Sequence, residues 1–442
     1  MLTRPLSRRR FLAAVPSVAG VGYLSCRALA EPAAPSAKLR IGVIGVGGRG
    51  GDNLGSVAGE SIAALCDIDD NQLKRAGSRF PDAKLFHDFR EMLADPKGLD
   101  AVVISTADHT HAPAAVRAMR HGLHVYSEKP LGHTVFEARL MRETYLARRD
   151  KIATQMGTQI HATENYRRVV ELVQAGAIGA VTHTHVWCNR FSSQNPIPQG
   201  ETKAPPHIHW DLWLGPAPAR PYQKGWMPGN LTWNRYWDFG NGILGDMGSH
   251  LIDLPYWALQ LTAPTAVHAL APEPKPDIYP ARLAVTWDHP ARGAGPHQQA
   301  CRITWYDGEA KPASLHDIDL RGYGIGALFV GETGKILADY GRVTVIPDPD
   351  KPQPKVQPAR IPSSLGHHQE WLAACKGKPT QTLCNFDYSG RLIEHNLLGV
   401  VSHRAGNLKL ACDAATGRTD SPAADAFLTK TYRPGWGYEV LS

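Results

Sequence analysis

Cysteine is scarce in this sequence, and the cysteines that occur form no recognisable pattern. Seven are present among 442 residues. None makes a Cys-x-x-Cys pair or a zinc-finger spacing, so neither a disulfide framework nor a zinc finger is indicated. The chain also lacks internal repeats, low-complexity tracts and a series of long apolar runs, which excludes disordered, collagen-like and multispan membrane proteins. Its 43% hydrophobic and 20% charged residues predict a globular chain with two or more cores.

Beyond its N-terminal segment, the sequence lacks the basic runs that follow a phosphate backbone. The formal net charge is +7, but residues 1–30 hold five arginines and no acidic residue. Without those arginines, 43 basic residues stand against 41 acidic ones. We therefore expect no nucleic-acid partner.

The N-terminal segment shows, in order, the features of a twin-arginine signal peptide. Ser7–Leu12 reads Ser-Arg-Arg-Arg-Phe-Leu, a weakly apolar stretch follows, and Ala28–Ala30 offers a small-x-small cleavage site. Residues 1–30 are therefore predicted to direct the folded protein, through the twin-arginine export machinery, to the periplasm or the outside. A basic N-terminus before an amphipathic helix is the alternative, but it does not explain this order.

A stable membrane anchor is not expected from the same segment. Pro16 and Gly20 interrupt a stretch that is only moderately apolar. Lipidation at Cys26 is a minor alternative, because Tyr23 stands where a lipoprotein box usually has leucine.

Residues 38–159 alternate short apolar runs with helical stretches, the pattern of a βαβ series. Strands are expected at 39–46, 61–66, 101–105, 123–126 and 151–155, and helices at 49–58, 70–79, 112–121 and 135–149. The series predicts an α/β domain of Rossmann type with a doubly wound parallel sheet.

From residue 160 to 442, strands follow one another with few helices between them. Helical stretches are expected at 163–175 and twice after 367, and strands at 180–189, 266–270, 281–287, 300–306, 326–330 and 343–346. This succession of strands predicts a second, α+β domain with a largely antiparallel open sheet.

A Gly-x-Gly-x-x-Gly motif follows the first expected strand, at Gly45, Gly47 and Gly50. Such glycines allow a tight turn and a close approach of the backbone to a pyrophosphate at the helix N-terminus. Asp67, at the end of the second strand, supplies a carboxylate for ribose hydroxyls and would repel a 2′-phosphate. Dinucleotide binding is predicted, with NAD favoured over NADP.

Two alternatives stay open for this part of the sequence. Lys74 and Arg75 are basic residues that could accept a 2′-phosphate, so NADP is less favoured but not excluded. Asp67 could instead cap the helix that follows it.

Four further motifs give the sequence a specific resemblance. They are Thr106–His111, Glu128–Pro130, Asp246–Asp253 (Asp-x-Gly-x-His-x-x-Asp) and Asn385–Ser389. With these motifs in this order, the chain resembles the Gfo/Idh/MocA superfamily of glucose-fructose oxidoreductase and inositol dehydrogenase, in particular an exported subgroup. The resemblance runs from about Lys38 to the end and implies a homodimer or homotetramer built on an exposed sheet face.

The resemblance also implies catalytic roles for three residues. His250 would be the general base, Lys129 the cation that binds the reacting oxygen, and Asp246 a substrate ligand or proton partner. The four-residue spacing of Asp246 and His250 places both on one helix face, which Asp253 would continue. The alternatives are a buried His250 satisfied by Asp253, and a surface ion pair of Lys129 with Glu128.

Cofactor contacts are expected at the carboxyl edge of the first sheet, where the ligands of such sheets bind. They would come from Thr106, His109, His111, Glu128 and Lys129.

A tryptophan-rich region offers rings suited to the apolar faces of a sugar. Substrate contacts are expected there from Trp210, Arg235 and Trp237, although core packing and an interface would use tryptophans as well. The pairs His183/His185 and His207/His209 are joined by no ligand set of recognisable spacing, so no metal is expected.

Together these features predict an exported NAD-dependent oxidoreductase acting on a carbinol of a sugar or sugar derivative. Outside the cytoplasm a dissociated cofactor could not be readily recovered, so tight binding is expected. The main alternative is a redox-neutral, NAD-dependent glycosidase, in which transient oxidation permits elimination. An alternative of another class is a non-catalytic sugar or dinucleotide sensor.

Overall fold

The computed structural model describes residues 38–192, 194, 202–227, 230–292, 299–378 and 382–438. The expected signal peptide, residues 1–30 with Cys26, lies outside the described residues. Within the described ranges, no helix combines the length and the apolar character needed to cross a membrane.

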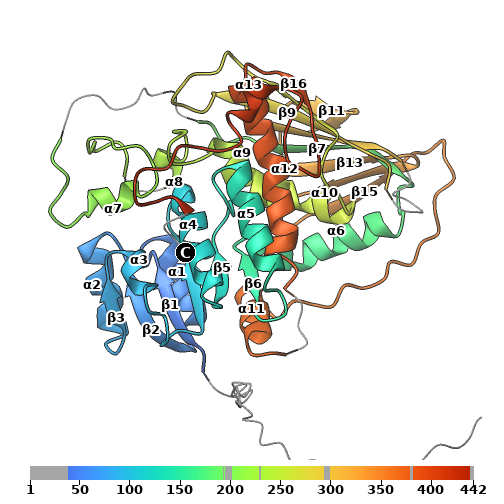
Figure 1. Ribbon diagram of the computed structural model, residues 1–442. Coiled ribbons are helices and arrows are strands. Elements are labelled where there is room, and N and C mark those ends of the chain that lie inside the picture. The colour runs from blue at the N-terminus through green and yellow to red at the C-terminus, as the bar shows by residue number, and fades with distance from the viewer. Residues whose placement is uncertain are drawn as a thin grey trace, which may run out of the picture. The chain divides into compact units, whose positions relative to one another are not determined.

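The first sheet has six parallel strands in the order β3-β2-β1-β4-β5-β6 (Figure 1), which confirms the predicted doubly wound arrangement. The strands are β1 (Arg40–Ile44), β2 (Ser61–Cys66), β3 (Lys84–Phe86), β4 (Ala101–Ile104), β5 (His124–Ser127) and β6 (Thr154–Met156). Apolar clusters cover both faces of this sheet, so its central strands have continuous apolar sequences. Strand order reverses between β1 and β4, the point where such sheets bind ligands.

Five helices accompany these strands. They are α1 (Arg49–Val57), α2 (Asp70–Arg79), α3 (Phe89–Met92), α4 (Asp108–Arg120) and α5 (Val135–Leu146). Helix α4 begins four residues before the expected start at 112. Its first turn holds the polar residues Asp108, His109 and His111, which do not show the apolar pattern of a buried helix although they are buried. Much of the Thr106–His111 motif is therefore a helix N-terminus.

The second sheet has eight strands in the order β15-β14-β13-β7-β10-β9-β8-β16. They are β7 (Val181–Cys188), β8 (Ala266–Leu270), β9 (Arg282–His289), β10 (Cys301–Gly308), β13 (Ile325–Gly331), β14 (Gly334–Ala338), β15 (Val343–Pro347) and β16 (Lys409–Ala411). Strands β7 and β10 pair in parallel and the other neighbouring strands of this sheet pair antiparallel, as predicted for a largely antiparallel sheet. A two-stranded ribbon joins β11 (Ser314–Leu315) to β12 (Ile318–Asp319).

Helices of the second half pack on this sheet and on the first domain. They are η1 (Gln159–Ala162), α6 (Glu164–Gln174), α7 (Trp210–Leu214), α8 (Asn230–Trp233), α9 (Gly242–Leu251), α10 (Asp253–Ala258), α11 (His367–Cys375), α12 (Phe386–Arg404) and α13 (Pro422–Asp425). The long helix α12 lies along α5 of the first domain and also contacts β8 and α9 (Figure 1).

Besides α12, two further parts of the C-terminal third contact the first domain. Trp371 of α11 is fully buried in the apolar cluster on one face of the first sheet, with Val43 and Tyr126. Trp436 packs beside Phe89 at a ring distance of 5.9 Å. The tail therefore completes the first domain, which no local pattern in the sequence indicated.

The helix expected to carry Asp246, His250 and Asp253 on one face is divided. Helix α9 ends at Leu251, and Asp253 begins α10. The carboxylate of Asp253 accepts from the Tyr388 hydroxyl at 2.6 Å and pairs with His161 Nδ1 at 3.0 Å. The carboxylate of Asp253 therefore binds Tyr388 and His161 and does not satisfy His250.

Candidate active site

Two glycines are sterically required where β1 leads into α1, one in the turn and one in the first turn of the helix. Gly45 has φ of 81°, and a Cβ there would lie 2.6 Å from the Ser105 carbonyl oxygen. A Cβ on Gly50 would lie 2.1 Å from the Gly45 carbonyl oxygen. This tight turn leaves Gly47 and Gly48 lining a cavity at the start of α1, where backbone amides would receive a pyrophosphate.

Asp67 stands directly after β2 and also lines the cavity. Its carboxylate accepts the backbone N–H of Val46 at 2.8 Å and that of Asp69 at 3.0 Å. Burial raises the pKa of Asp67 above its ordinary value. Asp69, whose side chain accepts from the Asn71 amide, caps α2, so the alternative of Asp67 as the helix cap is wrong.

The cavity has a volume of about 670 Å³ and joins the glycine turn to the residues expected to be catalytic. Among the residues that line it are Gly45, Gly47, Asp67, His87, Thr106, Asp108, Glu128, Lys129, Gln159, Trp213, Trp233, Asn234, Asp246, His250 and Trp436. The glycine turn, the Asp67 carboxylate after β2 and the length of this lining fit a dinucleotide.

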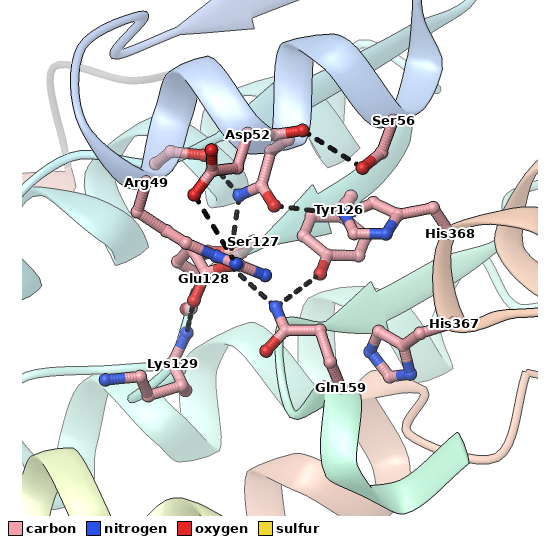
Figure 2. A network of polar contacts seen from close by, with 12 residues as sticks. Arg49, Asp52, Ser56, Tyr126, Ser127, Glu128, Lys129, Gln159, His367 and His368 are labelled. Atoms are coloured by element: carbon pink, nitrogen blue, oxygen red, sulfur yellow. Dashed lines mark hydrogen bonds and ion pairs between the residues drawn. The ribbon is translucent and has the colours of Figure 1, made fainter. Parts of the chain in front are cut away.

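Glu128 is the centre of a polar network at the cavity (Figure 2). Its Oε1 accepts from Arg49 Nε at 3.1 Å, from Asn53 Nδ2 at 3.0 Å and from Gln159 Nε2 at 2.9 Å. Burial would raise the pKa of Glu128, but the charges of Lys129 and Arg49 outweigh it and hold the pKa below its ordinary value. Glu128 is thus a buried carboxylate that fixes the segment bearing Lys129.

Lys129 pairs across the cavity with Asp246, not at the surface with Glu128. Its Nζ donates to Asp246 Oδ1, and Arg190 Nη1 lies 3.1 Å from Asp246 Oδ2. Burial would lower the pKa of Lys129, but the carboxylates of Asp246 and Glu128 outweigh it and hold the pKa above its ordinary value. Lys129 is therefore a cation at neutral pH.

His250 follows Asp246 by one helical turn and lines the same cavity. Burial, reinforced by the charge of Lys129, lowers its pKa to about 4. Its Nδ1 is buried with no hydrogen-bond partner among the described residues, and Asp253 binds His161 instead. A neutral histidine that lines the cavity can accept a proton from a hydroxyl group.

His109 and His111 were expected to contact the cofactor, but they bind backbone carbonyl groups and do not line the cavity. His109 lies between the carbonyl oxygens of Trp213 and Phe239, and His111 between those of Thr106 and Pro130. Both rings are buried, and they brace the walls of the site from behind.

The three residues of the tryptophan-rich region that were expected to contact substrate are likewise absent from the described cavity lining. Trp210 donates to the Arg220 carbonyl and stacks on Trp213, and Trp237 donates to the Lys275 carbonyl. Arg235 lies over the Tyr236 ring. The packing alternative describes the contacts of Trp210 and Trp237.

Other residues reach the site without a sequence signal of their own. Trp213, Trp233 and Trp436 line the cavity. The tryptophan-rich region could have suggested that Trp213 and Trp233 contact a ligand, but nothing in the sequence distinguishes these two from the other tryptophans of that region. Asp108 also lines the cavity, and burial raises its pKa well above the ordinary value.

Comparison with protein families gives two matches along the chain. Residues 39–158 match the model "Oxidoreductase family, NAD-binding Rossmann fold", and residues 170–379 match "Oxidoreductase family, C-terminal alpha/beta domain". Both belong to the Gfo/Idh/MocA group.

Curated relatives agree with this assignment. A glycosyl hydrolase family 109 protein of Solibacter usitatus is 33% identical over 243 residues, 47% of this chain and 52% of that protein. An inositol 2-dehydrogenase of Burkholderia multivorans is 32% identical over 152 residues, 33% of this chain and 44% of that protein. The chain thus spans about half the length of these relatives.

Solved structures share the fold at low sequence identity. The WlbA dehydrogenase from Bordetella pertussis, in complex with NADH and UDP-GlcNAcA, has a TM-score of 0.60 at 15% identity, covering 85% of this chain and 99% of that one. GenD2 from gentamicin A biosynthesis, in complex with NAD, has a TM-score of 0.57 at 20% identity, covering 86% and 97%. With both matched domains in order along its length, this chain belongs to the Gfo/Idh/MocA oxidoreductase family and has an NAD-binding Rossmann domain.

Proposed function

We propose that this protein is an exported, NAD-dependent oxidoreductase that acts on a carbinol of a sugar or sugar derivative and keeps its cofactor tightly bound. The observation that carries the proposal is the presence of Lys129, Asp246 and His250 in the same cavity as the glycine turn and Asp67. When bound, the nicotinamide cofactor would supply the hydride acceptor. Gly45, Gly47, Asp67 and Thr106 are the residues placed to hold it.

The chain's own residues supply proton transfer and charge. His250, neutral at physiological pH because its pKa is about 4, takes the proton of the substrate hydroxyl. Lys129, kept protonated by Asp246, donates to the same oxygen and stabilises its developing negative charge. Asp246 is held by both Lys129 and Arg190, so it positions the cation.

Tight cofactor retention follows from the proposed export. Outside the cytoplasm a released cofactor would be lost, so the bound cofactor must be regenerated in place. A donor and an acceptor sugar exchanging in turn at one site would meet this condition.

A redox-neutral glycosidase is the second candidate, and it meets the same condition. The similarity to the glycosyl hydrolase family 109 protein of Solibacter usitatus favours it. In this version the bound nicotinamide would accept a hydride from one carbinol carbon and later return it, while His250 would take the hydroxyl proton and Lys129 would stabilise the oxygen. The aglycone would leave by elimination between these two steps, and water would add to the resulting double bond before the hydride returns.

The deciding experiment measures the absorbance of enzyme-bound nicotinamide at about 340 nm, a property of the cofactor, after mixing with a panel of sugars and glycosides. Reduction that persists until a second sugar is added supports the oxidoreductase. Transient reduction with cleavage of a glycoside supports the glycosidase. Sugar-induced fluorescence changes without any reduction would instead identify a sensor.

A further inference from the structure

A second cavity lies between α12, the start of α5 and the segment that follows α13. Its volume is about 330 Å³, at the lower end of the range of small-ligand sites, and its described lining shares no residue with that of the cofactor cavity. Apolar side chains of α12 line it, namely Leu397, Val400 and Val401. Trp237, which the sequence suggested as a ligand contact, lines this second cavity as well.

Arg404, the last residue of α12, places its guanidinium in the second cavity beside two aromatic rings. Its Cζ lies 5.2 Å from the centre of the Trp237 ring and 4.6 Å from that of the Phe427 ring. Both distances are typical of cation–π contacts. The two rings come from separate segments, one before α9 and one after α13, so the guanidinium is held in place from two directions.

The rings give Arg404 no hydrogen-bond acceptor. Within the described part of the chain, its guanidinium forms no ion pair and donates no hydrogen bond, although it has five N–H donors. Burial lowers the pKa of Arg404 below its ordinary value and outweighs the charge of Asp238, whose carboxylate pairs with Arg220. A cation that is partly removed from water without an acceptor is costly, so a bound anion would offset this cost.

The other charged groups that line the second cavity already have partners. Lys430 Nζ lies 2.9 Å from Glu137 Oε1 and donates to His133 Nδ1 at 3.0 Å. His133 is neutral, because burial and the charge of Lys430 lower its pKa well below the ordinary value. Asp238 has its own arginine partner. Among the described lining residues, Arg404 therefore supplies one positive charge that no carboxylate neutralises.

We propose that the second cavity binds a small organic carboxylate, with the carboxylate on Arg404 and the carbon body against the apolar side chains of α12. The planar guanidinium matches the two oxygens of a carboxylate. A single unneutralised charge favours a monoanion over a phosphate monoester, which carries about −1.5 to −2 at neutral pH. The apolar lining favours a hydrocarbon body over a polyhydroxylated one.

A ligand in the second cavity would contact two segments that also lead to the active site. Asn241 directly precedes α9, the helix of His250, and His133 follows Lys129 by four residues. Both Asn241 and His133 line the second cavity, and Asn241 Nδ2 donates to the His133 carbonyl at 3.0 Å. The carboxylate would thus bind behind the catalytic residues without entering the cofactor cavity, and its binding would need no nicotinamide chemistry.

The test is a fluorine NMR titration of fluorobenzoate with the full chain, in excess NAD so that the cofactor cavity is occupied. We expect saturable binding of one equivalent. Unlabelled benzoate or hexanoate should displace it, whereas benzamide, which has the shape without the charge, and inorganic phosphate should not. Arg404→Gln should weaken binding by about tenfold or more, because hydrogen bonds between charged groups are lost. Arg404→Lys keeps the charge without the planar fork and should weaken binding less.

Arg391→Gln is the matched control on the same helix. Arg391 pairs with Asp387 at 3.1 Å and is absent from the described lining of the second cavity, so this variant should bind fluorobenzoate like the wild-type chain. Lys129→Ala should do so too, because Lys129 lines the other cavity.

Three results would overturn the proposed carboxylate site. They are no saturable binding of fluorobenzoate, benzoate or hexanoate, an unchanged affinity in Arg404→Gln, and a loss of binding in Lys129→Ala, which would place the anion in the cofactor cavity. Melting temperatures show whether each variant is folded. Should Arg404→Gln fail to fold, equal affinity in Arg404→Lys and the wild-type chain would overturn the site in its place.

Discussion

Lys129 and Asp246 lie 117 residues apart in the sequence and form a largely buried ion pair, with 16% and 6% of their side chains exposed. The pair joins the segment after β5 to helix α9, and His250 lies one turn further along that helix. Burying a charge pair is costly unless each partner is well bonded. Glu128 and Arg190 supply the additional charges that keep this one ionised.

Replacing the proposed acid–base residues should stop turnover without removing the cofactor. Lys129→Ala and His250→Ala should each lower turnover by roughly a hundredfold or more, because proton transfer and charge stabilisation are lost. Mass spectrometry of the native variants should still find NAD. Lys151→Ala, at an exposed position, is the control. Wild-type turnover in both site variants would remove the proposed mechanism.

Activity should fall at acid pH with a midpoint near 4, not near 6.5. His250 must be neutral to accept a proton, and its pKa is lowered to about 4, so protonation inactivates it only in that range. Asp246→Asn should lower the pKa of Lys129, because burial then acts without the opposing carboxylate. The alkaline limb of the kcat/KM profile should therefore move to lower pH. An unchanged alkaline limb would show that Asp246 does not act through Lys129.

The sequence predicted those parts of the fold that depend on local patterns. Alternating apolar runs predicted the parallel sheet, and the Glu-Lys-Pro segment and the Asp-x-Gly-x-His motif predicted residues that the structure brings into one cavity. The motifs did not show which of their residues line the cavity and which support its wall from behind. His111 sits in the same motif as Thr106, but it bonds two backbone carbonyls behind the wall.

Contacts between segments far apart in the chain could not be predicted from the sequence. Trp436 lines the cavity and Trp371 fills the core of the first domain, yet both come from the C-terminal third. Their positions depend on how the tail returns across the molecule. Short elements were also missed: β3 and β16 have three residues each, too few to show a period.

The glycine turn allows a matched test within one helix. Gly50→Ala should strongly weaken NAD binding, because its Cβ would lie 2.1 Å from the Gly45 carbonyl oxygen and force the start of α1 away. Gly55→Ala meets nothing within 4 Å and should stabilise α1 by up to about 1 kcal/mol, the difference in helix propensity. Isothermal titration with NAD and urea unfolding would measure both. Equal NAD affinity in the two variants would contradict the proposed role of the glycine turn in NAD binding.

Export should depend on the arginine pair of the N-terminal segment. Replacing Arg8 and Arg9 together by lysine should leave the protein in the cytoplasm, because the export receptor reads the arginine pair and not positive charge alone. Cell fractionation of the double variant against the wild-type chain measures this. A periplasmic double variant would refute export by this route while leaving the cofactor and catalytic predictions intact.

NAD should bind more tightly than NADP, and the difference should depend on the charge of Asp67. Asp67→Asn keeps an oxygen that can accept from Val46 N, as the carboxylate does at 2.8 Å, but removes the repulsion of a 2′-phosphate. The NAD-to-NADP affinity ratio should therefore fall by about tenfold or more, the loss of some 1.4 kcal/mol of discrimination. Asp67→Ala should also lower the NAD-to-NADP affinity ratio. It should in addition weaken the binding of NAD itself, because Val46 N in the glycine turn loses its hydrogen-bond acceptor. Titration of the cofactor-free protein with both dinucleotides decides the matter, and NADP affinity equal to that of NAD in the wild-type chain would overturn the assignment.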